Sequence, residues 1–237
     1  MNADKNVDGV IWDENRLTNL DDANDTIALQ RAVLKTMVHL VEFRDSDTGG
    51  HIERTQGYLG ALVGALIQND IYTQEIDKWD IWTFLNSAQL HDVGKISIPD
   101  NILQKPGKLT AQEFEIVKEH ATIGERIIEE ICQDIAHPSF LEHAKVLAGS
   151  HHEKWDGSGY PRGLKGYDIP LQGLLMAIAD VYDALISERP YKKATTHDQA
   201  TAIILEGKGT HFDPVLVDVF FDISDDFDRI AAIYKSK

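Results

Sequence analysis

The sequence of 237 residues contains a single cysteine, Cys132. One thiol excludes, within one chain, a disulfide framework and a zinc site built from several thiolates. Long hydrophobic runs are also missing: the longest, residues 59–67, is far shorter than the roughly 20 residues that span a bilayer. The first 15 residues are polar and lack the apolar segment of a secretory signal. We therefore expect a cytoplasmic protein that does not bind membranes.

Basic residues are scarce, with 23 Lys and Arg against 39 Asp and Glu, which gives a formal net charge of −16. A field of this sign repels polyphosphate, so binding to DNA or RNA is not expected. A small anionic ligand remains compatible with the sequence where bound cations invert the local field. Hydrophobic residues make up 43% of the chain, enough for a substantial core.

Apolar residues recur at spacings of three and four, and no alternating strand pattern appears. The expected fold is all-α, a helical bundle with one long loop at 152–170. Thr110 and Glu113 form a capping-box pattern at the start of one helix. The periodicity predicts helices over about 26–43, 51–69, 74–92, 111–133, 139–151, 171–187, 196–206 and 214–222.

Residues 1–25 are acidic and show no apolar period. We interpret them as a linker or an expression remnant, followed by one domain over residues 26–237. Within that domain, residues 26–45 are a candidate connector helix.

The segment His91-Asp92-Val93-Gly94-Lys95 follows an apolar helix. Adjacent His and Asp present a nitrogen and a carboxylate to one point, and the two carboxylate oxygens could bridge two metal ions. Lys95, one turn on, could neutralise a phosphate oxygen. Taken alone, the motif is better explained by a helix cap with a salt bridge.

A second motif, His151-His152-Glu153, precedes a glycine-rich segment that contains Gly159-Tyr160-Pro161. Tandem histidines can both reach a metal cluster where a helix ends and the chain turns. The glycines permit a tight loop beside a ligand. The alternative is an exposed polar turn.

Two further motifs place carboxylates near the candidate ligands. Asp180 and Asp183 lie in an apolar helix, where a carboxylate is costly unless it binds a metal or pairs with an arginine. Asp47 and His51 could approach one ion if Gly49-Gly50 bends the chain, although a charged helix junction explains them as well. Taken alone, six histidines are assigned structural roles: His39, His120, His137, His143, His197 and His211.

The candidate ligands are His and Asp with no thiolate, a set that suits iron, manganese, nickel or zinc. More than four candidates indicate more than one ion. Two or three closely spaced metals commonly support in-line displacement at phosphorus.

In this order the motifs resemble those of the HD-GYP family, a subgroup of the HD phosphohydrolases. The resemblance covers about residues 30–222 and includes Ile98-Pro99-Asp100, His120 and Arg189-Pro190-Tyr191-Lys192. It implies a five-helix HD core with additional helices. It also implies metal-dependent hydrolysis of cyclic di-GMP to linear pGpG, in some members on to GMP, by a metal-activated hydroxide. Two divalent ions, most commonly iron or manganese, are implied, with a third left open.

Carried over by position, the resemblance assigns roles to individual residues. Asp92 and Lys95 would be catalytic, Asp92 as the bridging carboxylate and Lys95 as a contact to the hydroxide or a phosphate oxygen. Asp47 stands where members with three metals often have Glu, so its role as a ligand is left open. The substrate pocket would be lined by Lys95, Tyr160, Asp183, Arg189 and Lys192. The metal ligands would be His51, His91, Asp92, His120, His151, His152 and Asp180.

Two alternatives to this function are kept. The chain could hydrolyse another cyclic dinucleotide, such as the mixed GMP–AMP one, or a simpler nucleotide. It could instead be a catalytically silent sensor of cyclic dinucleotides or an interaction module. The candidate partners, besides cyclic di-GMP, are an upstream receiver or sensory domain, a diguanylate cyclase, and a second copy that forms a homodimer through residues 26–43.

Overall fold

The computed structural model describes residues 23–44, 50–133, 139–188 and 193–234. The predictions that concern residues 1–22, Asp47, Arg189 and Lys192 lie outside the described residues. The chain divides into two compact units, residues 1–39 and 40–237, and helix α1 (Ala23–Arg44) crosses the boundary. Each unit is described by itself, and the domain limits predicted from the sequence stay a prediction.

The described part of the second unit is built from helices, which confirms the all-α prediction. Outside the helices, Lys208 and Phe212 form an isolated bridge. Short 3₁₀ helices are η2 (Ala88–Leu90), η3 (Val93–Ser97) and η4 (Gly166–Asp168). The α-helices are α2 (His51–Gln68), α3 (Thr73–Ile76), α4 (Ile81–Ser87), α5 (Asp100–Leu103), α6 (Ala111–Cys132), α7 (Ser139–Ser150), α8 (Leu171–Ile186), α9 (His197–Glu206), α10 (Pro214–Asp222) and α11 (Ser224–Tyr234).

Most of the predicted helices agree with the structure to within one residue at each end. The prediction of one helix over 74–92 was wrong. Asp80 is extended, and its side chain accepts a hydrogen bond from the Thr83 N–H at 2.7 Å, so that a separate helix α4 begins there. The capping box of Thr110 and Glu113 is confirmed at the start of α6.

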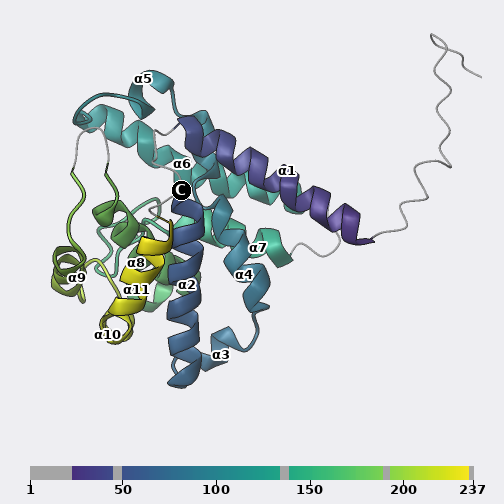
Figure 1. Ribbon diagram of the computed structural model, residues 1–237. Coiled ribbons are helices and arrows are strands. Elements are labelled where there is room, and N and C mark those ends of the chain that lie inside the picture. The colour runs from purple at the N-terminus through teal and green to yellow at the C-terminus, as the bar shows by residue number, and fades with distance from the viewer. Residues whose placement is uncertain (1–22, 45–49, 134–138, 189–192, 235–237) are drawn as a thin grey trace, which may run out of the picture. The chain divides into compact units, whose positions relative to one another are not determined.

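Helices α2 and α8 pack against each other at the centre of the second unit (Figure 1). Helix α11 lies along α2, while α7 contacts α8, α6 and α4. Tyr58 of α2 stacks on Phe227 of α11 with ring centroids 4.5 Å apart, and Tyr182 of α8 meets both rings edge-on. All three rings are fully buried, so this aromatic cluster fixes α2, α8 and α11 together.

Two glycines allow helices to approach closely beside the histidines. A Cβ added at Gly94 would lie 1.9 Å from the carbonyl oxygen of His120, so η3 contacts the backbone of α6. A Cβ at Gly173 would lie 2.4 Å from the Ser150 hydroxyl, so α8 packs tightly on the end of α7. These contacts bring four segments with candidate ligands to one place.

No helix in the described ranges is long and apolar enough to cross a bilayer.

Candidate metal centre

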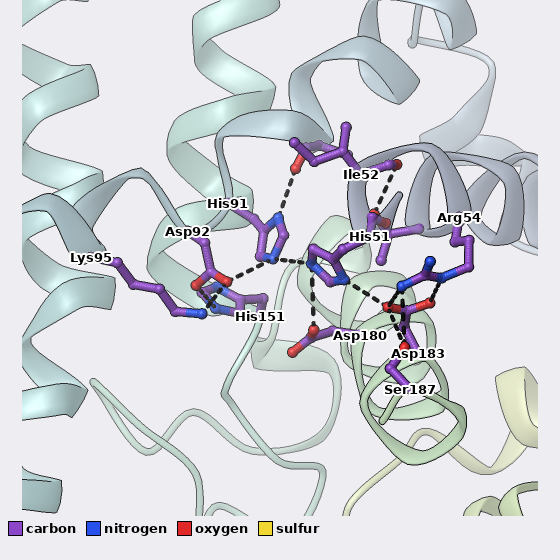
Figure 2. Close-up of polar contacts among 12 residues, drawn as sticks. His51, Ile52, Arg54, His91, Asp92, Lys95, His151, Asp180, Asp183 and Ser187 are labelled. Carbon is purple, nitrogen blue, oxygen red and sulfur yellow. Dashed lines mark hydrogen bonds and ion pairs between the residues drawn. The ribbon is translucent and has the colours of Figure 1, made fainter. Parts of the chain in front are cut away.

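The predicted ligands come from five separate segments, and Figure 2 shows side chains from four of them close together: His51, His91, Asp92, His151 and Asp180. His51 is the first residue of α2, and His91 and Asp92 lie between η2 and η3. His120 belongs to the middle of α6, and His151 directly follows α7. Asp180, in α8, is the fifth, so the structure brings together residues that lie up to 129 positions apart in the sequence, as the motif prediction requires.

The ligand atoms form two groups that share Asp92. In the first, His91 Nε2 lies 3.2 Å from Asp92 Oδ2 and 3.5 Å from His51 Nε2. In the second, Asp92 Oδ1 lies 3.3 Å from His120 Nε2 and 3.6 Å from His151 Nε2. His152 also belongs to the second group, and within each group the ligand atoms lie within 4.8 Å of one another. The two oxygens of Asp92 therefore face different groups, as a bridging carboxylate would.

Hydrogen bonds to the outer nitrogens determine which side of each imidazole faces the centre. His91 Nδ1 lies 2.8 Å from the carbonyl oxygen of Ala88, and His120 Nδ1 lies 2.6 Å from that of Val117. His151 Nδ1 lies 2.9 Å from the carbonyl oxygen of Leu147. Because a carbonyl oxygen can only accept, Nδ1 carries the proton in each case. The Nε2 atom of each ring therefore faces the centre, as is usual for histidines that bind metals.

The protonation of the cluster is set largely by burial. Burial lowers the pKa of His120 to about 4 and the pKa of His152 well below its usual value, so both rings are neutral near pH 7. Burial alone would raise the pKa of Asp92. The charge of Lys95 and the nearby His91 outweigh it and hold that pKa well below its usual range. Lone pairs of neutral rings thus converge on a carboxylate anion.

This donor set fits divalent metal ions. His120 and His151, whose Nδ1 atoms both face carbonyl oxygens, place their Nε2 atoms 3.4 Å apart, and two acceptor nitrogens at that distance repel unless a cation lies between them. Asp92 Oδ1 is buried and makes no hydrogen bond, although such an atom normally has a partner. Imidazole and carboxylate ligands without thiolate suit iron, manganese or zinc. Cations in both groups would satisfy every one of these atoms.

Asp180 and Lys95 lie at the edge of the cluster toward solvent. Asp180 Oδ1 lies 3.9 Å from His51 Nε2, and the Lys95 ammonium lies 2.7 Å from Asp92 Oδ2. Both side chains line a cavity of about 560 Å³ that opens beside the cluster. Tyr160 lines the same cavity, and burial, followed by the charges of Asp92 and Asp180, raises the pKa of its hydroxyl. That hydroxyl therefore stays protonated and can donate a hydrogen bond.

Asp183 does not line this cavity, contrary to the role carried over for it. Its side chain is buried and accepts hydrogen bonds from Arg54 Nε at 2.6 Å and from Arg54 Nη2 at 2.9 Å. It also contacts His51 Nδ1 at 2.8 Å, and Arg54 Nη2 donates a further hydrogen bond to the Ser187 hydroxyl (Figure 2). The alternative from the sequence, a buried ion pair with an arginine, describes Asp183 correctly. It orients His51 from behind.

The segment that contains Gly-Tyr-Pro folds around Glu153. The buried Glu153 carboxylate accepts hydrogen bonds from the N–H groups of Arg162 at 2.8 Å and Leu164 at 3.0 Å. A Cβ at Gly159 would lie 2.3 Å from the Lys154 nitrogen, so only glycine permits this turn. The ring of Tyr160 lies 4.7 Å from that of His152. The motif therefore combines residues that shape the loop with residues that face the cavity.

Sequence reasoning missed several residues that surround the predicted set. Arg54 supports His51 through Asp183 and also donates to the Ser187 hydroxyl, and these two partners lie 129 and 133 positions from Arg54. On the cavity wall, Lys105, Lys108 and Phe114 carry no metal-ligand signal. The Lys-Pro-Gly-Lys spacing of residues 105–108 between two helices was the one available hint.

Comparison with known proteins agrees with this arrangement. A family model described as "HD domain" matches residues 37–216, and the chain belongs to this family. The predicted HD-GYP assignment within it is confirmed. The solved structure of Bd1817, an HD-GYP-type protein from Bdellovibrio bacteriovorus, shares the fold, with a TM-score of 0.51 and 18% identity over 90% of this chain and 67% of that one.

Curated relatives are more similar in sequence. A "Cyclic di-GMP phosphodiesterase" of Vibrio cholerae is 48% identical over 90% of this chain and 43% of its own length. One of the same name from Thermotoga maritima is 40% identical over 81% of this chain and 48% of its own. A "3'3'-cGAMP-specific phosphodiesterase 2" of Vibrio cholerae is 39% identical over 85% of this chain and 36% of its own. The chain thus spans less than half the length of these relatives.

Proposed function

We propose that this chain hydrolyses cyclic di-GMP to linear pGpG in a metal-dependent reaction. One observation carries the proposal: imidazole nitrogens converge on both oxygens of a buried Asp92 at the end of a cavity that also presents Lys95 and Tyr160. The names of the relatives support a cyclic dinucleotide as substrate. Further hydrolysis to GMP would need a second attack at the same centre.

Two divalent ions fit the two ligand groups. His51, His91 and Asp92 would hold one ion, and Asp92, His120, His151 and His152 would hold the other. Asp180, beside His51, would complete the first set. Such ions would lower the pKa of a coordinated water toward neutrality and would stabilise charge on phosphate oxygens. Iron or manganese suits these ligands. Asp47 lies outside the described residues, so a third ion stays a prediction.

Side chains that line the cavity would bind the substrate and stabilise charge on its phosphate. Lys95, tied to Asp92 at 2.7 Å, holds a positive charge where a non-bridging phosphate oxygen would enter. The protonated Tyr160 can donate a hydrogen bond to the same phosphate or to the leaving oxygen. Asp183 and Arg54 keep His51 in one orientation and touch no substrate. We propose that Arg189 and Lys192, which lie outside the described residues, bind the rest of the dinucleotide.

The test begins with protein purified without oxygen. We expect two or more iron or manganese ions per chain, and pGpG or GMP after incubation with cyclic di-GMP. The double variant His91→Ala/Asp92→Ala should lose both metal and turnover, because it removes ligands from both groups. Undiminished turnover in this variant would contradict the proposed site.

Hydrolysis of the mixed GMP–AMP dinucleotide is the second candidate function, because one relative in the comparison is specific for it. Turnover of the two dinucleotides should be compared under identical metal loading. Binding without turnover of either would favour a sensor.

A further inference from the structure

Part of the cavity lining carries positive charge in a protein whose net charge is −16. Two of the lysines that line it, Lys105 and Lys108, lie on the connection between α5 and α6, away from the metal ligands. The only acidic side chains among the described lining residues are Asp92 and Asp180, which belong to the metal centre. The part of the lining that belongs to the connection between α5 and α6 is therefore suited to an anion.

The two lysines of the connection differ in their pairing. Lys105 lies 2.6 Å from Glu113, which is also part of the capping box of α6, so its charge is balanced. Lys108 is exposed and forms no ion pair within the described ranges. Lys108 thus provides the uncompensated positive charge of this part of the lining.

An exposed aromatic ring lies next to these lysines. Phe114, in the first turn of α6, lines the cavity and is 44% exposed, although a phenylalanine is normally buried. Its ring meets that of Tyr160 edge-on, with centroids 6.2 Å apart. Lys118 Nζ lies over both rings, 5.4 Å from the centroid of Phe114 and 5.6 Å from that of Tyr160, which places a cation beside the two aromatic side chains.

A cyclic dinucleotide has two phosphates and two purine bases, and only one phosphate can occupy the metal centre at a time. We infer that Phe114 and Lys108 form a second subsite, in which Phe114 stacks on a purine base and Lys108 binds the phosphate that is not being cleaved. Stacking of a base on an aromatic side chain tolerates either purine. This subsite therefore selects a dinucleotide over a smaller diester, and the inference rests on the proposed function.

The test compares a substrate that fills both subsites with one that fills only the metal centre. Phe114→Leu keeps the apolar bulk and removes the stacking surface. We expect it to raise KM for cyclic di-GMP roughly tenfold, with a much smaller change for bis(p-nitrophenyl) phosphate. Phe221→Leu, the same change at an exposed phenylalanine of α10 outside the cavity, should alter neither.

Lys108→Ala tests the charge. It should raise KM for cyclic di-GMP, and the difference from wild type should shrink as ionic strength rises, because salt screens an exposed charge. Lys78→Ala, at an exposed lysine outside the cavity, is its control.

Turnover of cyclic di-GMP by the wild type tests the proposed function. Binding of cyclic di-GMP, measured by calorimetry, tests the subsite independently of turnover. Binding by wild type that weakens in Phe114→Leu supports the subsite even without turnover. Equal KM and binding in wild type and Phe114→Leu, or no binding of cyclic di-GMP at all, overturns it.

Discussion

Asp183 joins two buried groups, the imidazole of His51 and the guanidinium of Arg54. Burial raises the pKa of a carboxyl group, but the hydrogen bonds from His51 and Arg54 outweigh that effect and lower the pKa of Asp183. The carboxylate is therefore an anion that neutralises Arg54 and fixes the ring of His51. Removing it would leave a buried guanidinium without a counter-charge.

Asp183→Asn is expected to lower the free energy of unfolding by about 3 kcal/mol, because it leaves Arg54 unpaired. It should also weaken manganese binding by about tenfold or more, since His51 loses its orientation. Urea unfolding and manganese titration measure the two effects. Asp77→Asn, at an exposed aspartate, should change neither, and a variant at position 183 that matched this control would refute the assigned role.

At the scale of elements, the contact between η3 and α6 depends on Gly94. A methyl group there would meet the His120 carbonyl oxygen at 1.9 Å, and backbone cannot yield as a side chain can. Gly94→Ala should therefore destabilise the protein by about 3 kcal/mol and reduce metal content, because His120 is displaced. Thermal unfolding and metal analysis report on both.

Gly64 provides the matched comparison, since the space around it within α2 is open. Gly64→Ala should stabilise the protein by about 0.5–1 kcal/mol, because alanine loses less backbone freedom in a helix. If Gly94→Ala and Gly64→Ala changed the stability equally, close packing at Gly94 would not explain the effect of Gly94→Ala.

The sequence predicts some helices better than others, and the reason lies in their local patterns. Long helices such as α2 and α6 carry strong apolar periods, α6 also begins with a capping box, and the ends of both were predicted to within one residue. The break at Asp80 was missed because its cap interrupts an apolar pattern that continues across it. Helix α11 was missed because its residues are strongly acidic and only Phe227 and Ala231 are buried.

The candidate ligands His91-Asp92 and His151-His152 stand out as adjacent pairs, a signal that is local in sequence, whereas His120 was assigned only through the family resemblance. The role of Asp183 was not predictable, since its partners Arg54 and His51 lie 129 and 132 positions away. Phe114 and Lys108 were missed for a related reason. Only the folded chain shows that an ordinary surface phenylalanine and lysine share a cavity wall.

For the whole molecule, the buried histidines His120 and His152 make the free energy of unfolding depend on pH. Burial lowers the pKa of His120 to about 4 and that of His152 well below its usual value, whereas an unfolded histidine titrates near 6.5. Below about pH 6.5 the unfolded chain therefore binds more protons than the folded one, and folding becomes less favourable as pH falls. The contribution of these histidines is complete above that pH and is lost progressively toward pH 4.

We expect metal-free protein, prepared with EDTA, to lose unfolding free energy between pH 7 and 5, by about 1 kcal/mol for each buried histidine per pH unit. Urea unfolding at pH 7.5, 6.0 and 5.0 measures this loss. His120→Asn should show a shallower dependence, because one of the titrating rings is gone. Manganese should raise stability most at the higher pH, since ligands must be deprotonated to bind it. A stability that stayed level or rose toward pH 5 in the metal-free protein would mean that these rings are not held neutral by burial.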